Sequence, residues 1–368
     1  MRASCLRYSA AAAEALVLHK DYPKARVITL NRPKGLNALN TVMIHALRDL
    51  VVDHPHPDAK AVVVIKSAVP KSFSTGGDII EQSGKDSREV MGRWSCVQGQ
   101  VDYHILIATN PFVSLLNGYV MGGAAGLALN GRYRVATETT QFAMPECSIG
   151  FFPNGGATWF LPRVPIAGLG LYLGLTGSRL KAGDLVHAGL ATHYIPSTEF
   201  GALEQALATI EDPFYVSSCV GSFQKAELPP LSFEQDLPVL ERVFSLRPDT
   251  TVEGIIEALK GERSPMAAKA LETMQRCSPL SLKLTLEQQK RSLRLPDYLE
   301  ALKNEVFASQ RLVEEPDFKE GVRALKTGDP SWKPPTLADV SDALVGEMFG
   351  TKKKGYYYFE PTGGPFIY

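Results

Sequence analysis

Three segments of the sequence combine residue types that can carry out chemistry. Two of them are glycine-rich, SFSTGGDI (72–79) and NGYVMGGAAGLAL (117–129), and each is typical of a strand that runs into a tight turn with outward-facing N–H groups. The third, MPECSIGFFPNGG (144–156), brings one carboxylate, Glu146, close behind them. Two converging N–H groups and one acid suit chemistry on a thioester carbonyl.

The first glycine turn contains Gly76, Gly77 and Asp78. Gly77 can bring its N–H to a ligand oxygen, because no Cβ blocks the approach. Asp78 can cap a following helix or tie the turn through its own backbone. Taken alone, such a triplet is more often only a turn.

The second glycine turn, at Gly122 and Gly123, leads into a helix of small apolar residues. The free N–H groups at the start of that helix would face whatever lies above Gly123. Close helix packing also accounts for the small residues. If the N–H groups of Gly77 and Gly123 converge, they form an oxyanion hole.

The elements that must position these turns follow from the hydrophobic pattern. Buried or alternating apolar runs predict strands and helical spacing predicts helices, in an order that indicates an α/β core with parallel strands. After about residue 200 the strand signals stop and helical periodicity continues. The predicted strands are 26–30, 61–65, 112–116, 133–136 and 141–144; the predicted helices are 39–52, 87–109, 236–260, 264–276, 279–294 and 297–314.

Composition excludes several classes of protein. The 39 basic and 39 acidic residues balance, which argues against a broad nucleic-acid-binding face, and no apolar run is long enough for a membrane span. The five cysteines are scattered without a C-x-x-C pair, so we expect a reducing compartment, no disulfide framework and no metal site. The first nineteen residues carry arginines, serines and alanines with no acid before Glu14. They suggest a short mitochondrial targeting segment; a frayed N-terminus is the alternative.

The combination of motifs resembles a known family. NRPKGLNALN (31–40), KSFSTGGDI (71–79), NGYVMGGAAGLAL and AMPECSIGFFPNGG are similar to the crotonase (enoyl-CoA hydratase/isomerase) superfamily. Within it, the chain resembles the 3-hydroxyisobutyryl-CoA hydrolase branch. Three further segments extend this resemblance over almost the whole chain: LTGSRLKAGDLVHAGLATHYIP (175–196), CSPLSLKLTLEQ (277–288) and DFKEGVRALKTGDPSWKPP (317–335).

The resemblance implies a fold, an α/β crotonase-like spiral of ββα turns followed by a helical C-terminal region. The expected organisation is a targeting segment at 1–19, the ββα core at 20–205, the helical region at 206–340 and an extended tail at 341–368. The aromatic and basic tail is either a flexible end or a strap laid on a partner.

The resemblance also implies roles for individual residues. Gly77 and Gly123 match the two backbone donors that hold the thioester oxygen, and Glu146 matches the glutamate that attacks the carbonyl or activates water. Neighbouring positions match the region that receives the acyl-CoA, and we expect substrate contacts from Ala38, Lys71, Phe73, Gly76, Asp78, Gln98 and Gly122. No cofactor is implied, because CoA is part of the substrate.

Three positions depart from the family pattern. Gly126 stands where hydratases carry a second glutamate, which makes water addition to a double bond an unsuitable reaction. Asn154 stands where the hydrolase branch has an aspartate, and Gln98 where related hydrolases have a substrate-contacting glutamate. An asparagine cannot accept a proton, although it can orient water or a substrate hydroxyl.

Three functions remain open at this point. The first is hydrolysis of a short-chain 3-hydroxyacyl-CoA, namely 3-hydroxyisobutyryl-CoA in valine breakdown, in the mitochondrial matrix. The second is a catalytically impaired homologue that serves as a structural subunit of the small subunit of the mitochondrial ribosome. The third is other CoA chemistry, such as isomerisation with Glu146 alone. Expected partners are the acyl-CoA, a second copy of the chain or, in the second case, ribosomal subunits.

Overall fold

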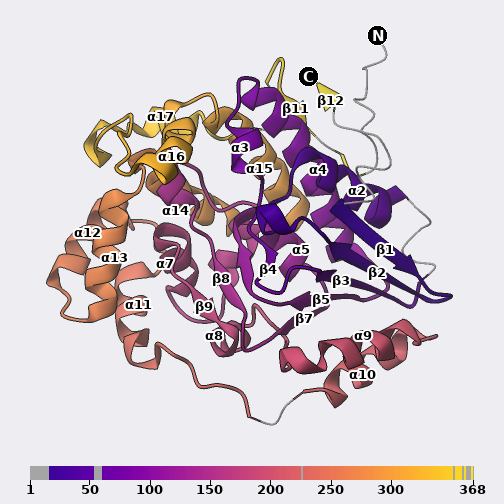
Figure 1. The fold of residues 1–368 in the computed structure, drawn as a ribbon. Coiled ribbons are helices and arrows are strands. Elements are labelled where there is room, and N and C mark those ends of the chain that lie inside the picture. Colours follow the sequence, from indigo (N-terminus) through magenta and orange to yellow (C-terminus); the bar gives the residue numbers. More distant parts are fainter. Residues whose placement is uncertain are drawn as a thin grey trace.

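The computed structural model of the chain describes residues 16–53, 60–224, 227–350, 353–358, 360–361 and 366–367. Two β-sheets form its centre and helices surround them (Figure 1). The larger sheet is parallel except for its first strand, in the order β1 (Val17–Asp21), β2 (Ala25–Leu30), β3 (Val62–Ser67), β5 (Phe112–Leu116), β7 (Tyr133–Ala136) and β10 (His193–Tyr194). The smaller sheet has the order β4 (Ser72–Ser74), β6 (Tyr119–Met121), β8 (Gln141–Ala143) and β9 (Leu180–Lys181).

Successive repeats each contribute one strand to both sheets. β3 and β4 precede helices α3 (Ile79–Gln82) and α4 (Ser87–Ile107), and β5 and β6 precede the 3₁₀ turn η4 (Gly122–Ala124) and helix α5 (Ala125–Leu129). β7 and β8 precede the 3₁₀ turn η5 (Glu146–Ile149). Because β4, β6 and β8 are paired in parallel, the turns that follow them meet at one edge of the smaller sheet. This confirms the ββα spiral and brings the three sequence motifs together.

The inner strands of the larger sheet, β2, β3, β5 and β7, are buried on both faces, as their continuous apolar runs predict. In β3, Val62 and Val64 pack with helices α9 (Phe200–Ala208) and α10 (Val216–Ser222), whereas Val63 and Ile65 belong to the main core on the other face. Residues that alternate along a strand point to opposite faces, so one short run supplies two cores. Helix α2 (Thr41–Arg48) lies on the main-core face, where it packs on α4. Asn40 caps it by accepting a hydrogen bond from Met43 N at 3.0 Å.

The C-terminal region is helical, as the sequence predicts. One detail of that prediction is wrong: segment 236–260 is two helices. The backbone leaves the helical conformation at Ser245, and Pro248 in the connection cannot donate a helical hydrogen bond. The helices are α11 (Leu237–Phe244), α12 (Val252–Gly261), α13 (Pro265–Arg276), α14 (Pro279–Ser292), α15 (Tyr298–Leu312), α16 (Pro316–Thr327) and α17 (Asp342–Gly346).

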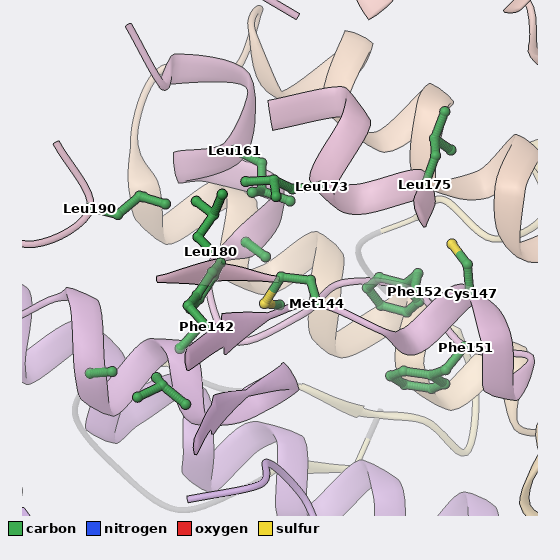
Figure 2. Packing of buried hydrophobic residues seen from close by; sticks show 14 of the residues in the cluster. Phe142, Met144, Cys147, Phe151, Phe152, Leu161, Leu173, Leu175, Leu180 and Leu190 are labelled. Atoms are coloured by element: carbon green, nitrogen blue, oxygen red, sulfur yellow. The ribbon is translucent and has the colours of Figure 1, made fainter. Parts of the chain in front are cut away.

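Aromatic packing fixes the segment 144–156, which carries Glu146. Figure 2 shows Cys147, Phe151 and Phe152 gathered beyond the end of β8. The rings of Phe151 and Phe152 stack with centroids 4.8 Å apart, and the Phe318 ring of α16 lies 5.1 Å from that of Phe151. Residues far apart in the sequence therefore hold this segment in place.

Gly170, in helix α7 (Leu169–Thr176), marks a close backbone approach. A methyl group at this position would lie 1.7 Å from the carbonyl oxygen of Leu161. We expect Gly170→Ala to lower the free energy of unfolding by about 2–3 kcal/mol through overpacking, measured by urea denaturation. Gly201→Ala is the matched control, since nothing lies within 4 Å of that position on α9; it should be neutral or stabilising. Equal stability of the two variants would contradict this account.

The two ends of the chain differ in part from expectation. Residues 1–15 of the predicted targeting segment lie outside the described residues, but residues 17–19 belong to β1, so the segment cannot extend to 19 without removing part of the sheet. In the tail, β11 (Tyr357–Tyr358) pairs with β12 (Phe366–Ile367). Gln310 of α15 exchanges two 2.7 Å hydrogen bonds with the backbone of Tyr357. The described part of the tail is thus a strap on its own chain.

Among the described residues, no helix is both long enough and apolar enough to cross a bilayer.

Candidate active site

The first glycine turn presents an unused backbone donor. Leu39 N donates to Gly76 O at 2.7 Å, and Asp78 N donates to Leu39 O at 3.0 Å. This parallel bridge uses the groups on either side of Gly77, so the N–H of Gly77 is directed away from Leu39. Gly76 has a φ of 92°, which only glycine adopts readily.

Asp78 completes this turn as a structural residue. Its Oδ1 accepts hydrogen bonds from Ile80 N and Glu81 N, which caps α3, and its Oδ2 pairs with the Arg32 guanidinium at 2.7 Å. The predicted cap is confirmed. Because both carboxylate oxygens have partners, Asp78 shapes the edge of the site and leaves the N–H of Gly77 for a ligand.

The second glycine turn lies against the first. Gly123 is in the first turn of a 3₁₀ helix, where N–H groups have no partner within the helix. A methyl group on Gly76 would lie 3.2 Å from Gly123 N, so the two turns are in contact. Gly122 has a φ of 55° and leaves room for Glu146, since a methyl group there would lie 2.8 Å from Glu146 Oε1.

Glu146 is a buried carboxyl at the start of η5, with an exposed fraction of 5%. Neither of its oxygens has a hydrogen-bond partner among the described residues. Burial raises the pKa of Glu146 to about 8, and the nearby Glu305 carboxyl adds to the rise. A buried acid without protein partners at a cavity wall is typical of a catalytic group.

Asn154 lies in the loop between η5 and helix α6 (Ala157–Phe160). A methyl group on Gly123 would lie 3.2 Å from Asn154 Oδ1, so the amide sits beside the second glycine turn. The loop is held by Glu305 of α15, whose Oε2 accepts from Gly156 N at 2.9 Å and whose Oε1 accepts from Thr158 N at 3.0 Å. Sequence reasoning missed Glu305, because nothing in its helical context distinguishes it from a surface glutamate.

These residues meet at a cavity of about 700 Å³. The volume suits a drug-sized or larger ligand. The predicted site residues on its wall are Ala38, Gly76, Gly77, Asp78, Gly122, Gly123, Glu146 and Asn154. Apolar side chains that the sequence analysis did not identify complete the wall: Trp94, Ile149, Phe151, Phe318 and Leu325. The last two come from α16, far along the chain, and only the packing of that helix on η5 brings them here.

Three predicted contact residues are not on this wall. Phe73 is fully buried in the core, where its side chain on β4 faces inward, so it gives this wall no side-chain contact. Lys71 is exposed just before β4 and does not line the cavity. Gln98 is 3% exposed and lies behind the second glycine turn, where its Nε2 donates to Gly123 O at 2.5 Å.

A second buried acid lies behind the glycine turn. Asp102 on α4 is fully buried, and a methyl group on Gly126 would lie 2.2 Å from its carboxyl atoms. The Asp102 carboxyl therefore occupies the volume that a side chain at position 126 would need. Burial raises its pKa well above the usual range, and the Glu305 charge adds to this. The sequence feature that could have identified Asp102 is its position one helical turn after Gln98.

The chain was compared with known proteins. A family model described as enoyl-CoA hydratase/isomerase matches residues 25–349. A relative named "3-hydroxyisobutyryl-CoA hydrolase, mitochondrial" from Danio rerio is 39% identical and covers 91% of this chain and 89% of its own; one of the same name from Dictyostelium discoideum is 37% identical, with 90% and 91% coverage.

Solved structures agree with this relationship. A carnitinyl-CoA dehydratase from Mycobacterium thermoresistibile superposes with a TM-score of 0.84 at 30% identity, covering 91% of this chain and 96% of its own. An enoyl-CoA hydratase from Rhodobacter sphaeroides gives 0.80 at 32% identity, with 91% and 97% coverage. Fold, motifs and near full-length similarity agree, and the chain belongs to the crotonase (enoyl-CoA hydratase/isomerase) family.

Proposed function

We propose that this protein hydrolyses a short-chain 3-hydroxyacyl-CoA thioester, 3-hydroxyisobutyryl-CoA, in valine breakdown in the mitochondrial matrix. The names of its similar relatives support the CoA hydrolase activity and the mitochondrial location. The observation that carries the proposal is Glu146, an unpartnered carboxyl among the described residues, on the wall that also presents Gly77 and Gly123.

In this reaction the thioester oxygen accepts hydrogen bonds from the N–H groups of Gly77 and Gly123. These donors stabilise the negative charge that develops when the carbonyl carbon becomes tetrahedral. Glu146 either attacks that carbon or removes a proton from an attacking water. The C–S bond breaks, the hydroxyl of water ends on the acyl carbon, and CoA leaves as a thiolate that takes up a proton. The reaction needs no cofactor beyond the CoA of the substrate.

We assign Asn154 a role in substrate selection. It is a neutral group with both a donor and an acceptor, and it lies next to Gly123 on the cavity wall. Such a group can bind the 3-hydroxyl of the acyl chain or a water, whereas it cannot take up a proton. We assign it to orientation and leave the acid–base chemistry to Glu146.

The pH dependence follows from the raised pKa of Glu146. Only the ionised carboxylate can attack or act as a base, so kcat/KM should rise about tenfold per pH unit below the pKa and level off above about 8. The pH profile of CoA release, followed with a thiol reagent, measures this. A profile that is flat or falls across this range would show that ionised Glu146 is not the reactive form.

Substrate choice tests the proposed acyl group. Purified protein would be assayed for CoA release from 3-hydroxyisobutyryl-CoA and from isobutyryl-CoA, which lacks only the hydroxyl. We expect the hydroxylated ester to have a kcat/KM at least about tenfold higher, because a polar group such as Asn154 is left unpaired by the deoxy ester. Equal values would contradict the 3-hydroxyacyl assignment while leaving thioester hydrolysis in place.

Asn154 itself favours one alternative, a catalytically impaired homologue that serves as a structural subunit of the mitochondrial ribosome. The site would then persist because the core needs the glycine turns. The tail does not support this alternative in its described part, since it is bound to α15 of the same chain. Co-sedimentation with mitochondrial ribosomes, together with absent CoA release, would favour the alternative over the hydrolase.

A further inference from the structure

Gln98 lies between two segments of the site that must keep a fixed separation. Its Nε2 donates to Gly123 O at 2.5 Å. A methyl group on Gly155 would lie 3.0 Å from the same nitrogen and 2.7 Å from Gly123 O. One amide therefore hydrogen-bonds the turn that supplies the oxyanion donor and lies next to the loop that carries Asn154.

This contact requires a hydrogen-bond donor at position 98. Gly123 O is an acceptor, so its partner must donate a proton. An ionised glutamate of the same length has acceptors only and would be repelled by the carbonyl. With 3% exposure, Gln98 is shielded from water that could compensate for that repulsion.

Asp102 supports Gln98 from the rear. It lies one helical turn further along α4, on the same face, and its carboxyl fills the space beside Gly126. Gln98, Asp102, Asn154, Glu305 and Ser309 line one small interior space behind the cavity wall. Burial holds the pKa of Asp102 well above its usual range, and neither oxygen of its carboxyl has a hydrogen-bond partner among the described residues.

We propose that Gln98 is a positioning residue that holds the Gly123 turn and the Asn154 loop in place for the thioester, with the side chain of Asp102 packed behind it on α4. The pair does not touch the substrate. It acts through Gly123, whose N–H must keep its place within a few tenths of an ångström to stabilise the oxyanion. This inference rests on the proposed thioester chemistry.

Variants at position 98 give the first test. We expect Gln98→Met, which keeps the length and loses the donor, to lower kcat about 10–100-fold while KM changes less than about threefold. Gln98→Glu should lower kcat at least as much at pH values where the new carboxyl is ionised. Gln275→Glu on the exposed face of α13 is the matched control and should leave both constants unchanged. A Gln98→Met enzyme with native kcat, or a Gln98→Glu enzyme with raised kcat, would overturn the proposal.

Variants at position 102 test this packing. Asp102→Asn keeps the shape of the side chain, so it should retain kcat within about threefold, whereas Asp102→Leu should lower kcat about tenfold. Loss of activity in Asp102→Asn equal to that in Asp102→Leu would show that a carboxyl group itself is required, and would overturn the packing role of Asp102.

A measurement without turnover separates this proposal from the proposed function. In the Glu146→Gln background, the infrared carbonyl stretch of bound isobutyryl-CoA reports how strongly the oxyanion donors polarise the thioester. We expect a shift to lower frequency on binding, and a smaller shift when Gln98→Met is added. An unchanged shift would overturn the positioning role. A native protein that shows this pattern but releases no CoA would contradict the hydrolase and leave the positioning role standing.

Discussion

Replacing Glu146 with glutamine should abolish CoA release, with kcat reduced about 10³-fold or more. The carboxylate is the nucleophile or base of the proposed reaction, and an amide can serve as neither. Glutamine is close to isosteric with the neutral carboxyl that the buried site already accommodates below the pKa of about 8. Substrate binding should therefore persist, and isothermal titration with isobutyryl-CoA should give a Kd within about threefold of native.

The stability of the Glu146→Gln variant gives an independent test, because the direction in which its free energy of unfolding changes with pH is fixed. The pKa of Glu146 is raised in the folded protein, from its ordinary value of 4.5 to about 8, so its neutral form favours folding at low pH. That stability is lost as the pH rises from the unfolded to the folded pKa. Glu146→Gln carries no such loss, so its free energy of unfolding relative to native should increase over this interval. A constant difference would contradict the buried, neutral carboxyl.

Asn154→Asp should increase kcat by about 10²-fold. The new carboxylate would lie beside Gly123 on the cavity wall and could accept the proton of an attacking water, a role worth about 10²–10⁴ in rate. Burial and the neighbouring acids should raise the pKa of the introduced carboxyl, and its charge should move the pKa of Glu146 further up. The pH profile of kcat/KM should shift to higher pH as the maximum rate increases.

Two comparisons make the Asn154 result specific. Asn154→Ser, which is small and neutral, should not increase the rate. The double variant Glu146→Gln, Asn154→Asp should stay inactive, since the new acid assists Glu146 and does not replace it. A rate increase in Asn154→Ser, or full activity in the double variant, would place the chemistry elsewhere in the cavity.

The fold and the glycine turns could be predicted because local signals determine them. A run of valines and isoleucine predicted the strand at 61–65, observed at Val62–Ser67, and helical spacing predicted Ser87–Ile107 to within a few residues. The turns depend on glycines that adopt positive φ, as Gly76 and Gly122 do. Because glycine is the residue that adopts such angles readily, its presence in the sequence is a direct signal for these turns.

The rest of the site depends on contacts between distant segments. Phe318 reaches the cavity because α16 packs on η5, and Glu305 holds the Asn154 loop from α15. Neither contact can be recognised from the residues that neighbour it in the sequence. Gln98 was predicted to touch the substrate because of its position in the family pattern; the structure turns it toward Gly123 O instead, where the backbone acceptor requires a donor.

The most direct test of the account is the release of free CoA from (S)-3-hydroxyisobutyryl-CoA by the native protein, assayed above the pKa of Glu146 beside the Glu146→Gln variant. We expect continuous turnover by the native chain and none by the variant. Equal release from both proteins, or none from either, would contradict the claim that Glu146 and the two glycine turns form a working thioester hydrolase site.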